Sequence, residues 1–409
     1  MAIPFVGLEP DTSRVTHVAR SRGMPTLNAA MQPSVLFLID ALERPGGTET
    51  HLLELTKRLP SEGYTPIVCN LAGDQPVLKL IADSGVETWP VTVHRLYAPA
   101  GRAVVRDVIS RAAGRGVAAI HTFHFKSDWM GVSVARALKC PLVSSRRDLG
   151  FAQTPLRRLA LRFIDPQVKA FIAPSRAVQT AVHEREGVAT ERIRVIYNGL
   201  DPARFSERGD RAEMRRDLGV PNDAAAIVMV GNLRPVKDHT TLIKAMGPVA
   251  AAHPNSHLVL VGEGTEMDRL SGLADSMGIR DHVTFAGARK DVARILAAMD
   301  VFVLSTHSEG MSNAIIEAMA AGLPVVATDV GGNAECVLEG VTGYIVPHEN
   351  VEALAHRLGG LLADSVSAKA MGAAGRDRVA EEFDVQAMVR RTADLYRNLT
   401  AAGRRNDAS

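Results

Sequence analysis

The stretch "HSEGMSNAIIEAMAAGLPVVATDVGG" holds two carboxylates around the start of a predicted helix. Glu309 lies in a glycine-containing loop that follows the predicted strand "DVFVLST". Glu317 lies eight positions later, inside the helical segment "NAIIEAMAA", which Gly322 and Pro324 bring to an end. Open α/β sheets bind ligands at the carboxyl ends of their strands, so the loop with Glu309 belongs to the ligand-binding edge.

The segment between these glutamates is suited to holding an anion. Gly310 allows close backbone approach, and the free N–H groups of a helix N-terminus favour a phosphate. We therefore expect the amides of Met311, Ser312 and Asn313 to face a phosphate. Glu317 is four residues beyond Asn313 on the same helical face, where its carboxylate can accept two hydroxyl donors, as a ribose presents. A phosphate with a carboxylate on each side indicates a nucleoside-diphosphate sugar.

Cations follow two other predicted strands. Lys237 comes a short loop after "AIVMVG", where it can neutralise a diphosphate and stabilise it as a leaving group. Arg146 and Arg147 lie in "SSRRDLGF", at the carboxyl edge of another sheet. They either grip a phosphate bidentately or form exposed ion pairs with Asp148.

The elements that must position these residues alternate along the chain. Short β-branched runs, from "VLFLID" to "IRVIYNG", are separated mostly by amphipathic helical segments such as "TETHLLELTKRL". A polar stretch with Asn-Gly and two prolines follows at 197–223, and the alternation restarts at "AAIVMVGN" and continues to "GYIVP". The pattern predicts an α/β fold of two Rossmann-like, doubly wound domains that face each other across a cleft.

These patterns also predict the domain limits. Residues 34–200 form an N-terminal, acceptor-side domain, and residues 201–380 form a C-terminal domain for the nucleotide-sugar donor. Residues 381–409 form a C-terminal helix that packs back toward the N-terminal domain, with a frayed tail. Residues 1–33 show neither clear periodicity nor a secretory apolar core, so we expect a disordered or non-native extension, with the natural start at Met24 or Met31.

Composition argues against several classes of protein. The net charge of +2 gives no reason to expect nucleic acid, and no run of about 18 uncharged apolar residues can cross a bilayer. Cys69, Cys140 and Cys336 are far apart and embedded in apolar segments, which predicts reduced, buried thiols in a cytoplasmic protein. Asp-x-Asp, His-Glu-x-x-His and Cys-x-x-Cys are absent, so we expect no metal centre and no cofactor.

Several motifs together resemble the GT4 family of retaining glycosyltransferases, which have the GT-B fold. Besides "SEGMSNAIIEAMAAGLPVVATDVGG", the motifs are "PGGTETHLLELTKRL", "VIYNGLD", "VGNLRPVKDHTTLIKA", "LVLVGEG" and "VTFAGARKDVARILAAMDVFVLST". They stand at family-like intervals, and the resemblance covers nearly the whole chain from Val35. It implies that Glu309 contacts the hydroxyls of the transferred sugar and that Glu317 contacts the ribose.

The resemblance implies roles for further donor-site residues. Gly47, in "GGTE", is implied to let backbone amides approach the donor phosphate or the acceptor. Family members commonly carry an arginine directly after the glycine of the "VGN" segment and a lysine further on. Here Asn232 stands at the arginine position and Lys237 matches the lysine. Arg234 is then either the carrier of the missing guanidinium or a surface cation.

A histidine at the end of a first-domain strand is implied to contact the transferred sugar or to help in catalysis. Family members often have a His-x-His pair and use its second histidine. This chain has His-x-x-His in "IHTFHFKSD", and the usual position falls on Phe123. Either His121 or His124 can therefore take the role while the other is structural, and we favour His124.

The implied activity is that of a cytoplasmic, metal-independent, retaining hexosyltransferase. It moves a sugar from a donor, UDP- or GDP-linked, to an acceptor hydroxyl in the synthesis of cell-surface polysaccharide or glycolipid. The family's mechanism needs no protein nucleophile, because the leaving phosphate oxygen can take the acceptor's proton. Two alternatives are a nucleotide-sugar 2-epimerase of the GT-B fold and a non-catalytic sugar-nucleotide binding protein.

One further segment bears on the acceptor, whose identity as a glycan or a lipid-linked molecule stays open. The stretch "TPLRRLALRF" has three arginines beside leucines. It either lies on the anionic inner membrane, where a lipid-linked acceptor resides, or is an ordinary surface helix with its leucines packed inward.

Overall fold

The computed structural model describes residues 32–44, 46–96, 98–150, 154–205 and 209–406. The predicted N-terminal extension therefore lies almost wholly outside the described residues, and so does the choice between Met24 and Met31 as the natural start.

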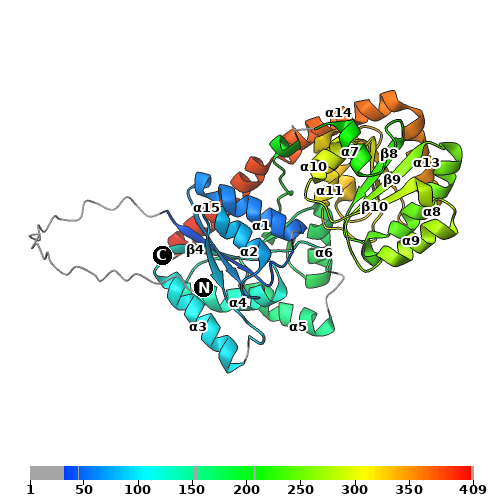
Figure 1. Cartoon of the computed structure of the whole chain (residues 1–409). Coiled ribbons are helices and arrows are strands. Elements are labelled where there is room, and N and C mark those ends of the chain that lie inside the picture. Colours follow the sequence, from blue (N-terminus) through cyan, green and yellow to red (C-terminus); the bar gives the residue numbers. More distant parts are fainter. Residues whose placement is uncertain (1–31, 45, 97, 151–153, 206–208, 407–409) are drawn as a thin grey trace, which may run out of the picture. The chain divides into compact units, whose positions relative to one another are not determined.

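Seven parallel strands form the first sheet, in the order β3-β2-β1-β4-β5-β6-β7. Figure 1 labels β4 in this sheet and β8, β9 and β10 in the second sheet. The strands are β1 (Ser34–Ile39), β2 (Thr65–Asn70), β3 (Glu87–Pro90), β4 (Val117–Thr122), β5 (Leu142–Ser145), β6 (Ala170–Ala173) and β7 (Ile193–Val195). The helices between them are α1 (Gly47–Arg58), α2 (Pro76–Asp83), α3 (Pro99–Ala113), α4 (Phe125–Leu138), α5 (Pro155–Ile164) and α6 (Arg176–Glu186). The chain reverses its direction of winding between β1 and β4, so the loops after these two strands border a topological switch point, where such sheets bind ligands.

Six parallel strands form the second sheet, in the order β10-β9-β8-β11-β12-β13. The strands are β8 (Ala225–Val230), β9 (Ser256–Val261), β10 (Val283–Gly287), β11 (Val301–Leu304), β12 (Val325–Thr328) and β13 (Gly343–Val346). The helices are α7 (Arg211–Asp217), α8 (His239–Ala252), α9 (Met267–Ser276), α10 (Val292–Ala297), α11 (Asn313–Ala321), α12 (Asn333–Cys336) and α13 (Val351–Ala363). Here the switch point lies between β8 and β11. The predicted fold class, two doubly wound α/β sheets, is confirmed.

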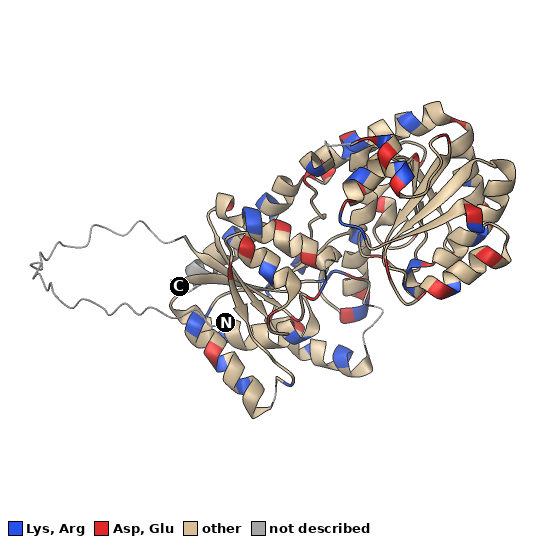
Figure 2. Cartoon of the chain, in the orientation of Figure 1, with Lys and Arg blue, Asp and Glu red and all other residues tan. Residues whose placement is uncertain are grey.

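Burial explains why these short runs form strands. None of the six strands of the second sheet contains a Lys, Arg, Asp or Glu, and the charges lie on helices and loops (Figure 2). Parallel strands covered by helices on both faces are buried on both sides, and they therefore appear as continuous apolar runs. In the first sheet, every residue of β1 is buried.

The chain crosses between the two sheets twice, at Leu200 and at Phe383, and these two crossings lie side by side. The N–H of Leu200 donates to the carbonyl of Phe383 at 2.8 Å, and the N–H of Val385 donates to the carbonyl of Leu200 at 3.2 Å. Gly199 is required beside them, because a Cβ atom there would lie 2.5 Å from the Cα of Val385. The limit predicted at residue 380 falls near the end of α14 (Ser365–Glu382), three residues before this crossing.

The last helix, α15 (Val385–Asn406), returns to the first sheet and packs on α1 and β4. Tyr396 is fully buried there, and its hydroxyl shares a 2.6 Å hydrogen bond with Nδ1 of His121. The ring of Tyr396 also meets Tyr64 edge to face at 5.7 Å. No helix in the described part of the chain is long and apolar enough to cross a membrane.

We predict that Tyr396→Phe lowers the free energy of unfolding by about 1 to 3 kcal/mol, because the variant leaves a buried imidazole nitrogen without its partner. Urea unfolding at neutral pH measures this loss. Tyr344→Phe is the control, since the Tyr344 hydroxyl has no hydrogen-bond partner among the described residues and its ring packs under Arg357. Equal stability of the Tyr396→Phe variant and the wild type would contradict the prediction.

Candidate functional site

The loops after β8 and β11 are tied together at the switch point of the second sheet. The hydroxyl of Thr306 and the N–H of His307 both donate to the carbonyl of Val236, each at 2.9 Å. These bonds bring Lys237, which follows β8, against Glu309, which follows β11, and the two side chains form an ion pair. The side chain of Lys237 is 23% exposed and that of Glu309 is 18% exposed. Two residues predicted for catalysis thus meet at the ligand-binding edge.

The N-terminus of α11 offers amides to an anion beside this ion pair. Ser312 caps the helix, and its hydroxyl accepts the N–H of Ile315 at 3.4 Å. The N–H groups of Asn313 and Ala314 have no intrahelical acceptor. No described side chain accepts their hydrogen bonds, so they remain available to a ligand.

Gly310 is needed here for a reason that the sequence did not indicate. A Cβ atom at this position would lie 2.2 Å from the carbonyl oxygen of Arg147 in the first sheet. The carbonyl of Gly310 accepts the hydroxyl of Ser175 at 2.7 Å and the N–H of Gly332 at 3.1 Å. Gly310 therefore lets the two sheets approach each other, and close approach of its backbone to a phosphate stays a prediction.

Two helix N-termini meet at this point. Gly47 begins α1, and a Cβ atom on it would lie 3.8 Å from the side-chain nitrogen of Asn313, which begins α11. No side chain caps the start of α1. Each helix carries a partial positive charge at this end, so an anion between the two starts is attracted by both.

The neighbouring helix starts are already filled. The carboxylate of Asp40 accepts the amides of Lys126 and Ser127 at the start of α4, at 3.1 and 2.7 Å. At the start of α6, the carboxylate of Glu335 accepts the amides of Arg176 and Ala177, both at 2.9 Å. The starts of α1 and α11 are therefore better placed to receive a phosphate than those of α4 and α6.

Arg147 extends the same site from the first sheet. Its Nη2 donates to Oδ1 of Asn198 at 2.5 Å, and Nδ2 of Asn198 donates to Oδ1 of Asn313 at 2.7 Å. Nη1 of Arg147 is buried and has no partner among the described residues. Burial lowers the pKa of Arg147 to about 10, although Glu49 opposes this effect. The guanidinium thus has a donor to spare, in keeping with the predicted phosphate contact.

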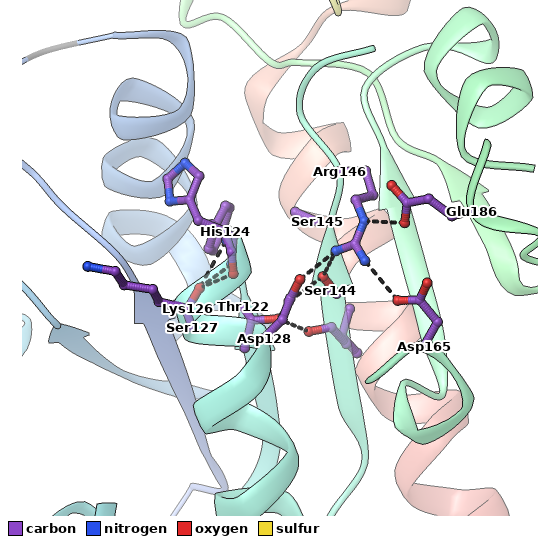
Figure 3. Close-up of polar contacts among 12 residues, drawn as sticks. Thr122, His124, Lys126, Ser127, Asp128, Ser144, Ser145, Arg146, Asp165 and Glu186 are labelled. Carbon is purple, nitrogen blue, oxygen red and sulfur yellow. Dashed lines mark hydrogen bonds and ion pairs between the residues drawn. The ribbon is translucent and has the colours of Figure 1, made fainter. Parts of the chain in front are cut away.

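Arg146 corrects the prediction made for it. Its guanidinium is buried among three carboxylates, with bonds of 2.7 Å to Asp128, 2.9 Å to Asp165 and 2.8 Å to Glu186 (Figure 3). It therefore neither grips a phosphate nor forms an exposed pair with Asp148. Burial raises the pKa of Asp165 to about 7 despite the attraction of Arg146, and the neighbouring carboxylates Glu186 and Asp128 add to the rise.

The two candidate histidines occupy different surroundings. His121 is fully buried, with Nδ1 bonded to Tyr396 and Nε2 bonded to the hydroxyl of Ser145 at 2.8 Å. Burial lowers the pKa of His121 to about 3, so its ring is neutral, and the candidate role in catalysis does not fit its position. His124 is half-buried at the cap of α4, and its Nδ1 has no partner among the described residues. His124 stays the candidate.

Glu317 lies on α11 in a pocket between the two sheets. The pocket is also lined by Thr50, Glu54, Gly199, Leu200, Asp201, Arg204, Asn313 and Ile316. The carboxylate forms no hydrogen bond or ion pair with a described residue. Burial raises the pKa of Glu317 to about 6, against the attraction of Arg204. A half-buried carboxylate without a donor is suited to accepting hydroxyl groups from a ligand.

Other predicted and unpredicted residues complete the site. Arg234 is exposed and has no ion pair in the described structure, so it stays a candidate for the diphosphate. His51 on α1 was not predicted. It is buried, and its Nδ1 has no partner among the described residues. Burial is the main cause that lowers the pKa of His51, and the charge of Arg147 lowers it further. Asn198 was missed too, because an Asn-Gly pair in a linker indicates only a turn.

Outside the site, one of the three cysteines differs from the prediction of buried thiols. Cys140 is half-buried rather than buried.

Two doubly wound sheets with a cation, two carboxylates and open helix starts at their edges define the GT-B class. Residues 45–204 match the family model described as Glycosyltransferase Family 4, and residues 210–378 match the model described as Glycosyl transferases group 1. The chain belongs to the GT4 glycosyltransferases.

Individual relatives agree with this assignment. A GDP-mannose-dependent alpha-(1-6)-phosphatidylinositol monomannoside mannosyltransferase of Mycolicibacterium smegmatis is 31% identical over 290 residues, which span 65% of this chain and 75% of that protein. A D-inositol 3-phosphate glycosyltransferase of Segniliparus rotundus is 28% identical over 66% of this chain and 64% of its own length. The crystal structure of HepE from Anabaena with UDP and glucose has a TM-score of 0.80 and 26% identity, over 90% of this chain and all of that one.

We predict that Glu317→Gln stabilises the protein at neutral pH. The raised pKa means that the folded state loses stability as pH rises from about 4.5 to about 6, because the buried carboxyl must ionise. The variant cannot ionise, so its free energy of unfolding at pH 7 exceeds the wild-type value by about 1 to 2 kcal/mol. Urea unfolding at pH 4.5 and pH 7 checks this, and an equal difference at both pH values would contradict it.

Proposed function

We propose that this protein is a retaining hexosyltransferase that moves a sugar from a nucleotide-diphosphate donor to an acceptor hydroxyl in cell-surface polysaccharide or glycolipid synthesis, in the cytoplasm. The ion pair of Lys237 and Glu309 beside the start of α11 carries this proposal. A diphosphate seated on the amides of α11 takes over Lys237 as its counter-charge. Glu309 is then released from its partner and accepts hydroxyl groups of the sugar.

The same residues support the chemistry of transfer. The bond from the anomeric carbon to the diphosphate oxygen breaks, and a bond to the acceptor oxygen forms on the same face of the sugar. The proton of the acceptor hydroxyl passes to the departing diphosphate oxygen. Charge develops on the diphosphate, where Lys237, the amides of α11 and the free donor of Arg147 are placed to stabilise it. These groups do what a divalent metal does at other diphosphates, so we propose that the reaction is metal-independent.

The donor proposal draws on the relatives. One is named for GDP-mannose, and the HepE structure holds UDP and glucose. Mannose and glucose are both hexoses, so we propose a UDP- or GDP-linked hexose as the donor. We propose that Glu317 accepts the ribose hydroxyls; in support, it lies four residues after Asn313 on the same face of α11, and both residues line one pocket.

Glu309→Ala is the direct test. We expect transfer to fall by at least about 100-fold, because a contact to the reacting sugar is lost. The chain should stay folded, with a lower melting temperature because Lys237 loses its partner. Glu352→Ala, an exposed position on α13, is the matched control. The donor is first identified by the rise in melting temperature with UDP-, GDP- and ADP-hexoses. Wild-type turnover by Glu309→Ala would refute the assignment, and an inverted anomer in the product would refute retention.

The same assays separate the two alternatives. A nucleotide-sugar 2-epimerase converts UDP-GlcNAc without an acceptor, and chromatography of the incubated donor detects its product. A non-catalytic binding protein raises its melting temperature with a donor but neither hydrolyses nor transfers it across a panel of acceptors.

We further propose that α5 brings the acceptor side onto an anionic membrane. Its apolar residues Leu156, Leu159 and Phe163 are 76%, 52% and 70% exposed, and Trp129 on α4 is 42% exposed. Leu161 and Ile164 pack inward, as on an ordinary surface helix, whereas Leu156 and Leu159 do not. The arginines of the helix are exposed and form no ion pair in the described structure; they are Arg157, Arg158 and Arg162. Exposed apolar side chains beside unpaired cations match the surface of an anionic bilayer.

We predict that the full chain sediments with vesicles that contain phosphatidylglycerol and much less with vesicles of phosphatidylcholine alone. Phe163→Glu should weaken this binding by about tenfold or more, because burial of one large apolar side chain contributes about 1.5 to 3 kcal/mol. Val366→Glu is the matched control, since Val366 is 78% exposed but lies on α14. Equal binding of both variants would exclude α5 as the contact.

A further inference from the structure

Two loops of the second sheet bring metal-binding side chains together beside the Lys237–Glu309 pair. His307 follows β11 and lies two residues before Glu309. His348 and Glu349 follow β13. One nitrogen or oxygen atom from each of His307, His348 and Glu349 lies within 4.8 Å of the others. Short sequence motifs cannot indicate this group, because its members come from distant parts of the chain.

The geometry of the group is close to that of a metal site. Glu349 lies between the histidines, with one carboxylate oxygen 3.7 Å from Nδ1 of His307 and the other 3.9 Å from Nδ1 of His348. Ligand atoms of a tetrahedral zinc site lie about 3.3 Å apart, since each is about 2.0 to 2.1 Å from the ion. All three side chains are exposed, at 37%, 56% and 66%, so rotation of their side chains can bring the ligand atoms closer.

A fourth residue gives an independent indication. Asp238 is only 7% exposed, and its Oδ1 caps α8 by accepting the N–H of Thr241 at 3.2 Å. Oδ1 is also 3.8 Å from Nε2 of His307, the ring nitrogen that faces away from Glu349. Oδ2 is buried and has no partner among the described residues. A histidine that binds a metal usually donates its other N–H to a carboxylate, and Asp238 is placed to accept that hydrogen bond.

We propose that His307, His348 and Glu349 bind a Zn²⁺ ion and that Asp238 orients His307 behind it. Two imidazoles and one carboxylate suit this ion, and water completes the tetrahedron. The ion joins the loop after β13 to the loop that carries Glu309, and through Asp238 it also reaches the residue next to Lys237. The proposal does not rest on the transfer reaction.

The test measures zinc binding by the full chain without an affinity tag. The protein is stripped with chelator, dialysed against buffered Zn²⁺ and assayed for bound metal. We expect one ion per chain, with an affinity at least tenfold weaker in His307→Ala and in His348→Ala. His356→Ala is the matched control, because His356 is exposed on the nearby α13 but lies outside the group. Unchanged affinity in both His307→Ala and His348→Ala would overturn the proposal.

Two further measurements keep the result independent of folding and of transfer. Asp238→Asn retains an oxygen that can cap α8, so we expect an unchanged melting temperature in chelator and zinc affinity about tenfold weaker. Co²⁺ in place of Zn²⁺ should give the visible absorption of a four-coordinate ion, and a six-coordinate spectrum would contradict the proposed site. Donor binding is measured on the stripped protein, so a failure of zinc binding and a failure of the proposed function remain distinguishable.

Discussion

The ion pair between Lys237 and Glu309 is the interaction on which the rest of the site depends. Both charges are largely withdrawn from water, and a cation or anion left alone there would be costly. Each is therefore the other's partner until a ligand supplies a better one. The second sheet makes this possible because β8 and β11 are neighbours at its switch point, and the loops after them must meet.

The sequence predicted this part of the molecule well because the signals are local. Apolar runs without charges indicated the strands, and residues after parallel strands must lie on one edge of a sheet. Lys237, Glu309 and the start of α11 could thus be assigned to one place without knowledge of any long-range contact. Helical spacing assigned Glu317 to the same face as Asn313, and the family resemblance implied its contact with the ribose.

The sequence failed where a side chain's role depends on distant partners. Arg146 and Arg147 are adjacent and look alike, but carboxylates from α4, from the residue after α5 and from the end of α6 enclose Arg146. The sequence left the catalytic role open between His121 and the favoured His124, and α15 places the Tyr396 hydroxyl on the ring of His121. The group of His307, His348 and Glu349 was not predicted for the same reason. No periodicity or spacing indicates which of two similar residues meets such partners.

Contacts from both sheets converge on the start of α11, and this has a consequence for ligand binding. Ser175 holds the carbonyl of Gly310, and Asn198 holds the side chain of Asn313, so residues of the first sheet and of the linker fix the helix start. Closing this start onto that of α1 brings two partial positive charges together, and the carboxylate of Glu49, in the first turn of α1, offsets them only in part. In the donor complex that we propose, a diphosphate between them removes the remaining repulsion. The donor should therefore stabilise the approach of the two sheets as well as occupy its own site.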